Sequence, residues 1–236
     1  MNSLRRCREC LSLLQAIFLY WPEFRDLARP HLRAIRKEAV LYQTYRCNVK
    51  KARKYLRVCP LRLELGSGSF RRSGWVGIDV VGDPELELDL RRPLPFPDNS
   101  VDEIHSEHFL EHLCYSEVTH VLRECWRVLK EGGMISFSVP NMRPYLQAYS
   151  VGDVAFLRER VYDTPRDGRY DRCGLDIINW FALREGDHKF MFDDENAVLR
   201  LREAGFVGVG VREFDPERDY NRRSSSVYVQ GAKSFR

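Results

Sequence analysis

Two histidines and a glutamate that could carry out chemistry stand close together in the segment His108-Phe-Leu-Glu-His112. Imidazole takes up a proton near neutral pH, and imidazole and carboxylate groups both bind divalent metals. Side chains three and four residues apart lie on one face of a helix, so these groups can converge. Three interpretations remain open: a proton acceptor beside a substrate, a metal site, and a structural brace for the helix. We expect the first, with His108 as the base.

A metal site in this segment would use His108, Glu111 and His112, and the distant His188 could join them. The pattern H-x-x-E-H also spells the inverted zinc-peptidase signature, which requires a long helix around the motif and a further acid. Here the motif directly follows a predicted strand, so we do not expect a peptidase. A divalent metal is compatible with these residues, but we expect the protein to have none.

His188 stands in an aromatic segment, after Gly186-Asp187 and before Phe190-Met-Phe192. A histidine in such surroundings is commonly a packing residue, and the alternative is a catalytic group that faces a substrate. The same two readings apply to aromatic residues nearby, because aromatic faces suit both sugars and a helical core. These residues are Tyr145, Tyr149, Trp180 and Phe181.

Three acidic residues mark the ends of successive predicted strands. Glu64 precedes a glycine loop that contains Gly66 and Gly68, and Asp79 and Asp89 end the next two apolar runs. Glycine lets a backbone approach a ligand closely, and a carboxylate at a strand end can accept hydrogen bonds from ribose hydroxyls. No Gly-Lys-Ser or Gly-Lys-Thr follows the glycines, so the pattern indicates a nucleoside site without a phosphate-binding lysine.

Strands and helices alternate along most of the chain. The strands are expected at 61–65, 75–79, 86–89, 101–106, 134–139, 206–214 and 227–232, and the helices at 4–20, 31–57, 116–130 and 193–204. This alternation predicts an α/β fold, a doubly wound, mostly parallel, seven-stranded sheet that is Rossmann-like. The last two strands have no helix between them, so we expect an antiparallel strand at the C-terminal edge.

The charge pattern divides the chain into two predicted parts. Residues 1–60 hold 14 Lys and Arg against 4 Asp and Glu, whereas residues 61–236 hold 24 against 30. We therefore expect a basic helical extension at 1–57 and a catalytic domain at 58–236. Residues 142–190 fit no regular unit, and we expect them to form a cap over the substrate. The basic extension suits nucleic acid, an anionic membrane surface or a solvated helix face.

The cysteines and the apolar segments indicate the compartment. The seven cysteines are odd in number and irregular in spacing, which argues against a secreted disulfide framework. No window reaches 18 consecutive apolar residues, so we expect no transmembrane segment. We expect a cytoplasmic protein, and a weak membrane-surface contact through the N-terminus stays open because Leu11–Trp21 follows three arginines.

Four motifs and the C-terminal region together resemble class I S-adenosylmethionine-dependent methyltransferases, in particular small bacterial members of the type 11 group. The motifs are Leu63-Glu-Leu-Gly-Ser-Gly68, Asp89-Leu-Arg-Arg-Pro-Leu-Pro-Phe-Pro-Asp-Asn-Ser-Val-Asp102, Ser106-Glu-His-Phe-Leu-Glu-His112 and Leu122-Arg-Glu-Cys-Trp-Arg-Val-Leu-Lys-Glu-Gly-Gly133. The tail adds His188-Lys-Phe-Met-Phe-Asp-Asp and Leu201-Arg-Glu-Ala-Gly-Phe206. The resemblance spans about residues 60–232. It implies S-adenosylmethionine as the cofactor.

The resemblance also assigns cofactor contacts to individual residues. It implies that Glu64 lies near the methionine amino group and that Asp79 holds the ribose. The loop of Gly66, Ser67 and Gly68 passes under the cofactor, and Asp89 with Leu90 frames the adenine. Ser106 to His108 lie beside the methionine and the transferred methyl group, and His188 lies near the acceptor pocket.

The sequence departs from the family pattern after the glycine loop. Ser69 and Phe70 stand where a further small residue is usual, and only Ser69–Gly74 separate the loop from the next strand. We therefore expect a turn in place of the usual helix.

We expect methylation of an oxygen on a sugar, a glycolipid or another small metabolite, by in-line displacement with a histidine base. His108 and His188 are the expected catalytic residues. Two alternatives stay open. One is a nucleic-acid methyltransferase that uses the basic N-terminus, and the other is a non-catalytic scaffold that has kept the fold.

Overall fold

The computed structural model describes residues 22–161, 165, 167–219 and 226–235. The chain forms two compact units, residues 1–46 and 47–236. The expected division into a basic extension at 1–57 and a catalytic domain at 58–236 stays a prediction. The helix expected at 4–20 lies outside the described residues.

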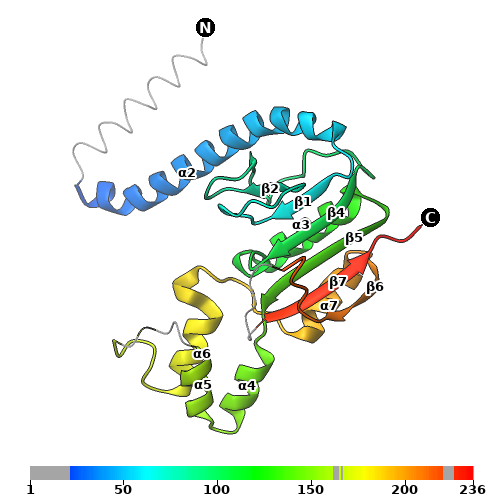
Figure 1. Ribbon diagram of the computed structural model, residues 1–236. Coiled ribbons are helices and arrows are strands. Elements are labelled where there is room, and N and C mark those ends of the chain that lie inside the picture. Colours follow the sequence, from blue (N-terminus) through cyan, green and yellow to red (C-terminus); the bar gives the residue numbers. More distant parts are fainter. Residues whose placement is uncertain (1–21, 162–164, 166, 220–225, 236) are drawn as a thin grey trace. The chain divides into compact units, whose positions relative to one another are not determined.

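A long helix precedes the sheet. Helix α2 spans Pro22–Ala52 and is followed by a short 3₁₀ helix, η1, at Arg53–Arg57 (Figure 1). The helix expected at 31–57 begins earlier, at Pro22, and α2 continues through Pro30. A proline removes one backbone donor from a helix, and the turns on either side of Pro30 keep their helical form.

The second unit is built on a seven-stranded sheet (Figure 1). Its strands are β1 (Arg62–Leu65), β2 (Val76–Asp79), β3 (Leu86–Glu87), β4 (Val101–Glu107), β5 (Leu129–Pro140), β6 (Val207–Arg212) and β7 (Ser226–Ala232). The order across the sheet is β3-β2-β1-β4-β5-β7-β6. The predicted mostly parallel α/β sheet is confirmed. The antiparallel strand is β7, which lies one position inside the edge, between β5 and β6.

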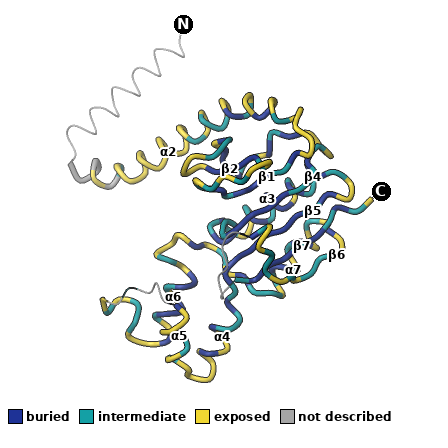
Figure 2. The backbone as a smooth tube through the Cα atoms, viewed as in Figure 1, coloured by how far each residue is buried: buried dark blue, intermediate teal, exposed yellow. Residues whose placement is uncertain are grey.

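The register separates an apolar face from a polar face. Leu63, Ile104 and Ile135 are neighbours across β1, β4 and β5, and Glu64 and His105 with Ser136 form the adjacent row. Successive strand residues point to opposite faces, so the first row is apolar and the second is polar. Figure 2 shows that these strands are buried along most of their length.

Two amphipathic helices provide the buried apolar residues that pack on the sheet. Helix α3 (Tyr115–Val128) contacts β5, and helix α7 (Asp194–Glu203) contacts β6, β7 and α3. A Cβ atom placed on Gly231 of β7 would contact Leu201 of α7. Gly231 pairs with Ile135 of β5, which belongs to the apolar row. The helices therefore cover the apolar face.

Helix α3 starts and ends close to the predicted positions. Cys114 is the N-cap, and its backbone N–H donates to the Glu117 carboxylate at 2.8 Å. The helix ends at Val128, and β5 follows it directly.

The expectation that residues 142–190 lack regular structure is wrong. They form helices α4 (Arg143–Ser150), α5 (Val154–Arg160) and α6 (Gly174–Leu183) and a short 3₁₀ helix, η3 (Arg184–Gly186). The helices share a buried cluster in which the rings of Tyr145 and Phe181 lie 4.2 Å apart. Trp180 packs against this cluster, whereas Tyr149 is exposed. Tyr145, Trp180 and Phe181 therefore belong to a core that the helices form among themselves.

Candidate functional site

The glycine loop lies where the strand order reverses. Strands β2 and β3 continue from β1 on one side, and β4 and β5 on the other, so the carboxyl ends of β1 and β4 form the switch point. Gly66 and Gly68 both have positive φ, at 70° and 55°. A Cβ on Gly66 would collide with Phe109, whereas one on Gly68 would project into open space. No helix follows the loop before β2, so the predicted turn is confirmed.

Asp79, the predicted ribose ligand, fixes the glycine loop. Its carboxylate accepts backbone N–H groups from Gly68 at 2.8 Å, Val80 at 2.6 Å and Val81 at 3.1 Å. A carboxylate has about four acceptor positions, so one remains for a ligand hydroxyl. Asp79 thus holds the loop in place at the switch point, and its contact with ribose stays a prediction.

Glu64, the predicted partner of the methionine amino group, is tied to a buried histidine. Its Oε1 atom lies 2.8 Å from Nδ1 of His105, and Nη1 of Arg72 lies 3.5 Å from its Oε2. The other ring nitrogen of His105 lies 3.2 Å from Asp219. Burial disfavours the charged imidazole, but the hydrogen bonds to Asp219 and Glu64 outweigh burial and raise the pKa of His105.

Asp219 completes this row with a bidentate ion pair. Arg212 donates to its two carboxylate oxygens at 2.6 and 2.7 Å. Burial favours the neutral acid, but the hydrogen bonds from Arg212 and His105 prevail and lower the pKa of Asp219. Sequence reasoning missed His105, Asp219 and Arg212. The one available signal was a histidine inside a strand, at the same register as Glu64.

Asp89, the predicted adenine residue, is held by the two arginines that follow it. Arg91 donates through its backbone N–H at 3.0 Å and through Nε and Nη2 at 2.9 Å, and Nε of Arg92 lies 3.6 Å away. Burial alone would raise the pKa of Asp89, but these arginine contacts lower it. Leu90 beside it is buried. Glu64, Asp79 and Asp89 thus lie at or near the carboxyl ends of successive strands, in the predicted order. Each of them bonds to another group of the chain.

Unsatisfied hydroxyl groups show that the switch point suits a polar ligand. The Oγ atoms of Ser67, Ser106 and Ser138 are buried and have no hydrogen-bond partner within residues 22–161, 165, 167–219 and 226–235. A buried polar atom without a partner costs free energy, so such groups commonly face a ligand or water. The open space beside Gly68 lies at the same loop. The residues present therefore fit a nucleoside cofactor with a polar tail.

His108 adopts a strained backbone at the end of β4. Its φ is 52°, a left-handed conformation that is uncommon for residues other than glycine and that clusters at functional sites. Its Nδ1 lies 3.2 Å from Oε1 of Glu111, and its Nε2 lies 2.8 Å from the Ser226 hydroxyl. The expectation that this motif starts a helix is wrong. Glu111 and His112 lie in the 3₁₀ helix η2 (Leu110–His112), ahead of α3.

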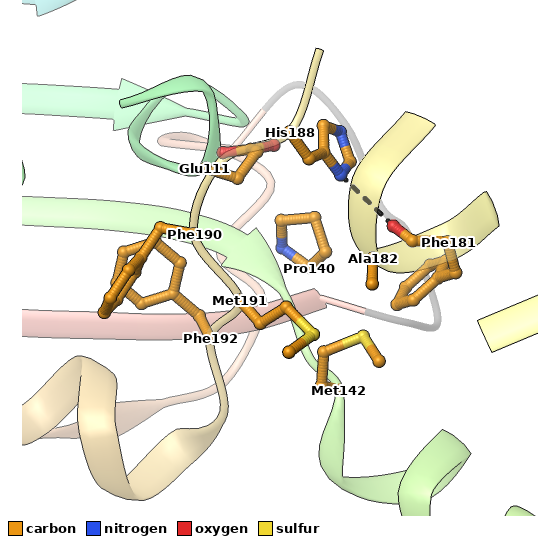
Figure 3. A pocket seen from close by; sticks show the side chains of 9 residues that line it. All are labelled: Glu111, Pro140, Met142, Phe181, Ala182, His188, Phe190, Met191 and Phe192. Carbon is orange, nitrogen blue, oxygen red and sulfur yellow. Dashed lines mark hydrogen bonds between the residues drawn. The ribbon is translucent and has the colours of Figure 1, made fainter. Parts of the chain in front are cut away.

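His188 lines an apolar cavity between the sheet and the helical segment (Figure 3). The other residues that line the cavity are Glu111, Pro140, Met142, Phe181, Ala182, Phe190, Met191 and Phe192. The ring Nδ1 of His188 lies 3.2 Å from the Phe181 carbonyl, and it must be the donor because a carbonyl only accepts. Burial lowers the pKa of His188, so the ring is neutral near neutral pH.

The structure brings Glu111, His112 and His188 together. One ligand atom from each lies within 4.8 Å of the others, and the two imidazole rings meet edge to face at 5.1 Å. The backbone N–H groups of Lys189 and Phe190 both donate to the Glu111 carbonyl, so two distant segments are joined here. Of the predicted metal residues, Glu111 and His112 converge with His188, whereas His108 bonds to Oε1 of Glu111 and is not part of this group.

Comparison with known proteins shows what this chain is similar to. A family profile described as a methyltransferase domain matches residues 77–137. The ubiquinone/menaquinone biosynthesis C-methyltransferase UbiE of Salmonella arizonae is 29% identical over 150 residues, which is 62% of this chain and 53% of the relative. The same enzyme of Salmonella paratyphi B matches to the same extent. The chain thus spans about half the length of the curated relatives it matches.

Solved structures with a similar course of the chain include a methyltransferase from Methanosarcina mazei, described as dependent on S-adenosylmethionine. It is 17% identical, has a TM-score of 0.48, and the match covers 78% of this chain and 97% of that one. A phosphoethanolamine N-methyltransferase from Haemonchus contortus, in complex with S-adenosylmethionine, is 11% identical with a TM-score of 0.43, over 81% and 53%. No helix in the described part of the chain has the length and apolar composition needed to cross a membrane.

Proposed function

We propose that this chain, which belongs to the class I S-adenosylmethionine-dependent methyltransferases, methylates an oxygen atom of a sugar, a glycolipid or another small metabolite. The observation that carries this proposal is the position of His108. Its Nδ1 pairs with a buried carboxylate, and its Nε2 meets a hydroxyl group at 2.8 Å. A carboxylate, an imidazole and a hydroxyl in this order form the arrangement of a general base acting on an alcohol.

The residues of the site would have different roles in the reaction. S-adenosylmethionine supplies an electrophilic methyl group on a sulfonium. Glu111 holds the His108 ring so that Nδ1 carries the proton and Nε2 offers a lone pair. The Ser226 hydroxyl then marks the position where an acceptor hydroxyl would give up its proton to Nε2. The chain otherwise contributes alignment of the two reactants and exclusion of water.

His188 and the apolar cavity support an acceptor site beside the methyl donor site. Glu111 lines the cavity and also bonds to His108, so the cavity adjoins the proposed base. We place His188 at the acceptor side of the reaction, where its buried ring lies beside the Phe181 carbonyl in a lining that is mostly apolar (Figure 3). Such a lining suits the flat or apolar part of an acceptor.

C-methylation is the second candidate, because the curated relatives are named as C-methyltransferases of ubiquinone and menaquinone biosynthesis. The mostly apolar side chains that line the cavity suit contact with a quinol ring as well as with the apolar face of a sugar. A base is needed in either case, since a phenol hydroxyl must lose its proton before the ring carbon attacks. The product of the reaction therefore distinguishes the two candidates.

The first experiment is a calorimetric titration of S-adenosylmethionine into the full chain. We expect micromolar binding, about 8 kcal/mol, and an affinity roughly 10- to 100-fold lower in Asp79→Ala, because hydrogen bonds to a charged group are lost. Asp83→Asn is the matched control, since this exposed carboxylate lies close to the same turn and pairs only at the surface with Arg71. No binding to folded protein would contradict the proposal and favour a scaffold.

The second experiment identifies the methylated atom. Purified protein is incubated with labelled S-adenosylmethionine and a panel of sugars, glycolipids, quinols and RNA, and the products are analysed by mass spectrometry. A methyl ether that is absent with His108→Asn supports O-methylation with this base. A ring-methylated quinol identifies the second candidate, and a methylated nucleotide would overturn both.

A further inference from the structure

The cluster of Glu111, His112 and His188 has the composition of a metal site. Two imidazoles and one carboxylate form the common three-ligand set that leaves further coordination positions open. The donor atoms lie within 4.8 Å of one another. Bonds of about 2.1 Å need donor separations of roughly 3 to 3.5 Å, so small side-chain rotations would complete the site.

Backbone carbonyls orient both imidazoles in the same way. Nδ1 of His188 donates to the Phe181 carbonyl at 3.2 Å, and Nδ1 of His112 donates to the Asp187 carbonyl at 3.0 Å. In the neutral form of each ring the proton is therefore on Nδ1, and Nε2 carries the lone pair. Metal-binding histidines commonly have this arrangement, in which the second nitrogen is bonded to a carbonyl or carboxylate.

One oxygen of the Glu111 carboxylate has no hydrogen-bond partner among the described residues. Oε1 is 3.2 Å from His108, whereas Oε2 is buried and accepts no hydrogen bond from the part of the chain that the structure describes. The Glu111 side chain is 2% exposed, so a negative charge at Oε2 has lost its water. A buried carboxylate oxygen without a donor costs several kcal/mol unless a cation or a proton neutralises it. This oxygen is an observation independent of the clustering of the three residues.

We propose that Glu111, His112 and His188 bind a divalent transition metal through one carboxylate oxygen, Oε2, and two Nε2 atoms. Imidazole ligands favour Zn²⁺, Co²⁺, Ni²⁺ or Fe²⁺ over Mg²⁺ and Ca²⁺, which prefer oxygen. Glu111 and His188 line the apolar cavity, and Figure 3 shows the two side chains next to each other at one side of it. The open coordination positions of the metal would therefore face the cavity and take an oxygen atom of a molecule bound there.

His108 would position this site without joining it. Its hydrogen bond to Oε1 fixes the Glu111 carboxylate, and Ser226 fixes the other ring nitrogen of His108. The backbone N–H groups of Lys189 and Phe190 donate to the Glu111 carbonyl and so hold the two segments together. The site would thus be organised before the metal binds.

The test is a titration of Co²⁺ into the metal-free full chain, followed by its visible absorption spectrum and by calorimetry. The background is a Cys7→Ser/Cys10→Ser variant, because this Cys-x-x-Cys pair is itself a metal-binding motif. We expect one Co²⁺ per chain, displaced by Zn²⁺ but not by excess Mg²⁺, and no thiolate-to-metal band. Glu111→Gln and His112→Ala should each weaken binding by about 100-fold or more.

Two controls keep the outcome decisive. His31→Ala removes an exposed histidine of the other unit and should leave Co²⁺ binding unchanged. Thermal unfolding of each variant shows whether it has folded, and Glu111→Gln keeps the shape of the side chain. Binding that is absent in the wild type, or unchanged in both Glu111→Gln and His112→Ala, overturns the proposal. Because Co²⁺ binding is measured without S-adenosylmethionine, its failure leaves the proposed methyl transfer standing, and the reverse also holds.

Discussion

Nδ1 of His105 lies 2.8 Å from Oε1 of Glu64, and both side chains are at most 2% exposed. The pair connects neighbouring strands on the polar face of the sheet, where His105 also meets Asp219. Because the turn between β1 and β2 is short, this face lacks the helix that a βαβ unit would place there. A buried row of charges therefore occupies a position where apolar packing is usual.

Disrupting this row should destabilise the fold. Asp219→Asn leaves Arg212 buried beside a neutral partner, and removal of one partner of a buried pair costs roughly 3 to 5 kcal/mol. We expect the free energy of unfolding in urea to fall by about this amount. Asp83→Asn, which changes an exposed ion pair, should leave the urea midpoint unchanged. Equal midpoints for Asp219→Asn and wild type would show that the row does not stabilise the fold.

The same row gives stability a defined pH dependence. The pKa of His105 is raised above 6.5, so its contribution is complete below pH 6.5 and disappears as the pH rises through the folded pKa. The pKa of Asp219 is lowered below 3.8, so its contribution is complete above pH 3.8 and disappears as the pH falls. Urea midpoints measured from about pH 4 to about pH 9 should therefore decline on the alkaline side. The His105→Gln variant keeps Glu64, Arg72 and Arg212 and should lack the part of the alkaline decline in urea midpoint that His105 causes.

The two glycines of the loop should respond differently to the same substitution. Gly66→Ala places a Cβ against Phe109 at positive φ, so we expect a loss of stability of roughly 2 kcal/mol or more. Gly68→Ala meets open space and should cost about 1 kcal/mol from its φ alone. Calorimetry with S-adenosylmethionine should then show weaker binding by folded Gly68→Ala, because its new methyl group enters the ligand space. If folded Gly68→Ala binds S-adenosylmethionine with wild-type affinity, the cofactor does not lie beside Gly68.

The sequence predicts the sheet and the strand-end acids well because both depend on local patterns. Alternating apolar residues locate β1 and β4, and an acid after a strand must lie at the carboxyl edge of a parallel sheet. The partners of those acids depend on tertiary contacts. Asp219 is 114 residues from His105 in the chain, and no local pattern links them.

The helices within residues 142–190 could not be predicted from local patterns. Their charged and aromatic residues do not alternate clearly, and the buried cluster around Tyr145 forms only when three helices pack together. The pairing of His112 with His188 has the same origin, because backbone hydrogen bonds to Glu111 bring their two segments into contact. Sequence reasoning named both histidines but could not show that they meet.

The last prediction concerns His108, whose backbone limits the choice of variant. His108→Asn is suitable because asparagine tolerates the positive φ that most residues resist. We expect turnover with the identified acceptor to fall by about 10²- to 10⁴-fold, since a general base is lost. The affinity for S-adenosylmethionine should stay at the wild-type value, because the ring faces Ser226 and Glu111 and not the glycine loop.

Ser226→Ala is the matched variant for this measurement. It removes the hydroxyl that the acceptor would replace at Nε2 of His108, so turnover should change by no more than about threefold. A large loss in Ser226→Ala together with normal turnover in His108→Asn would assign the chemistry to the serine. If both variants turn over like wild type, the proton leaves the acceptor by another route, and His108 serves only to position Glu111.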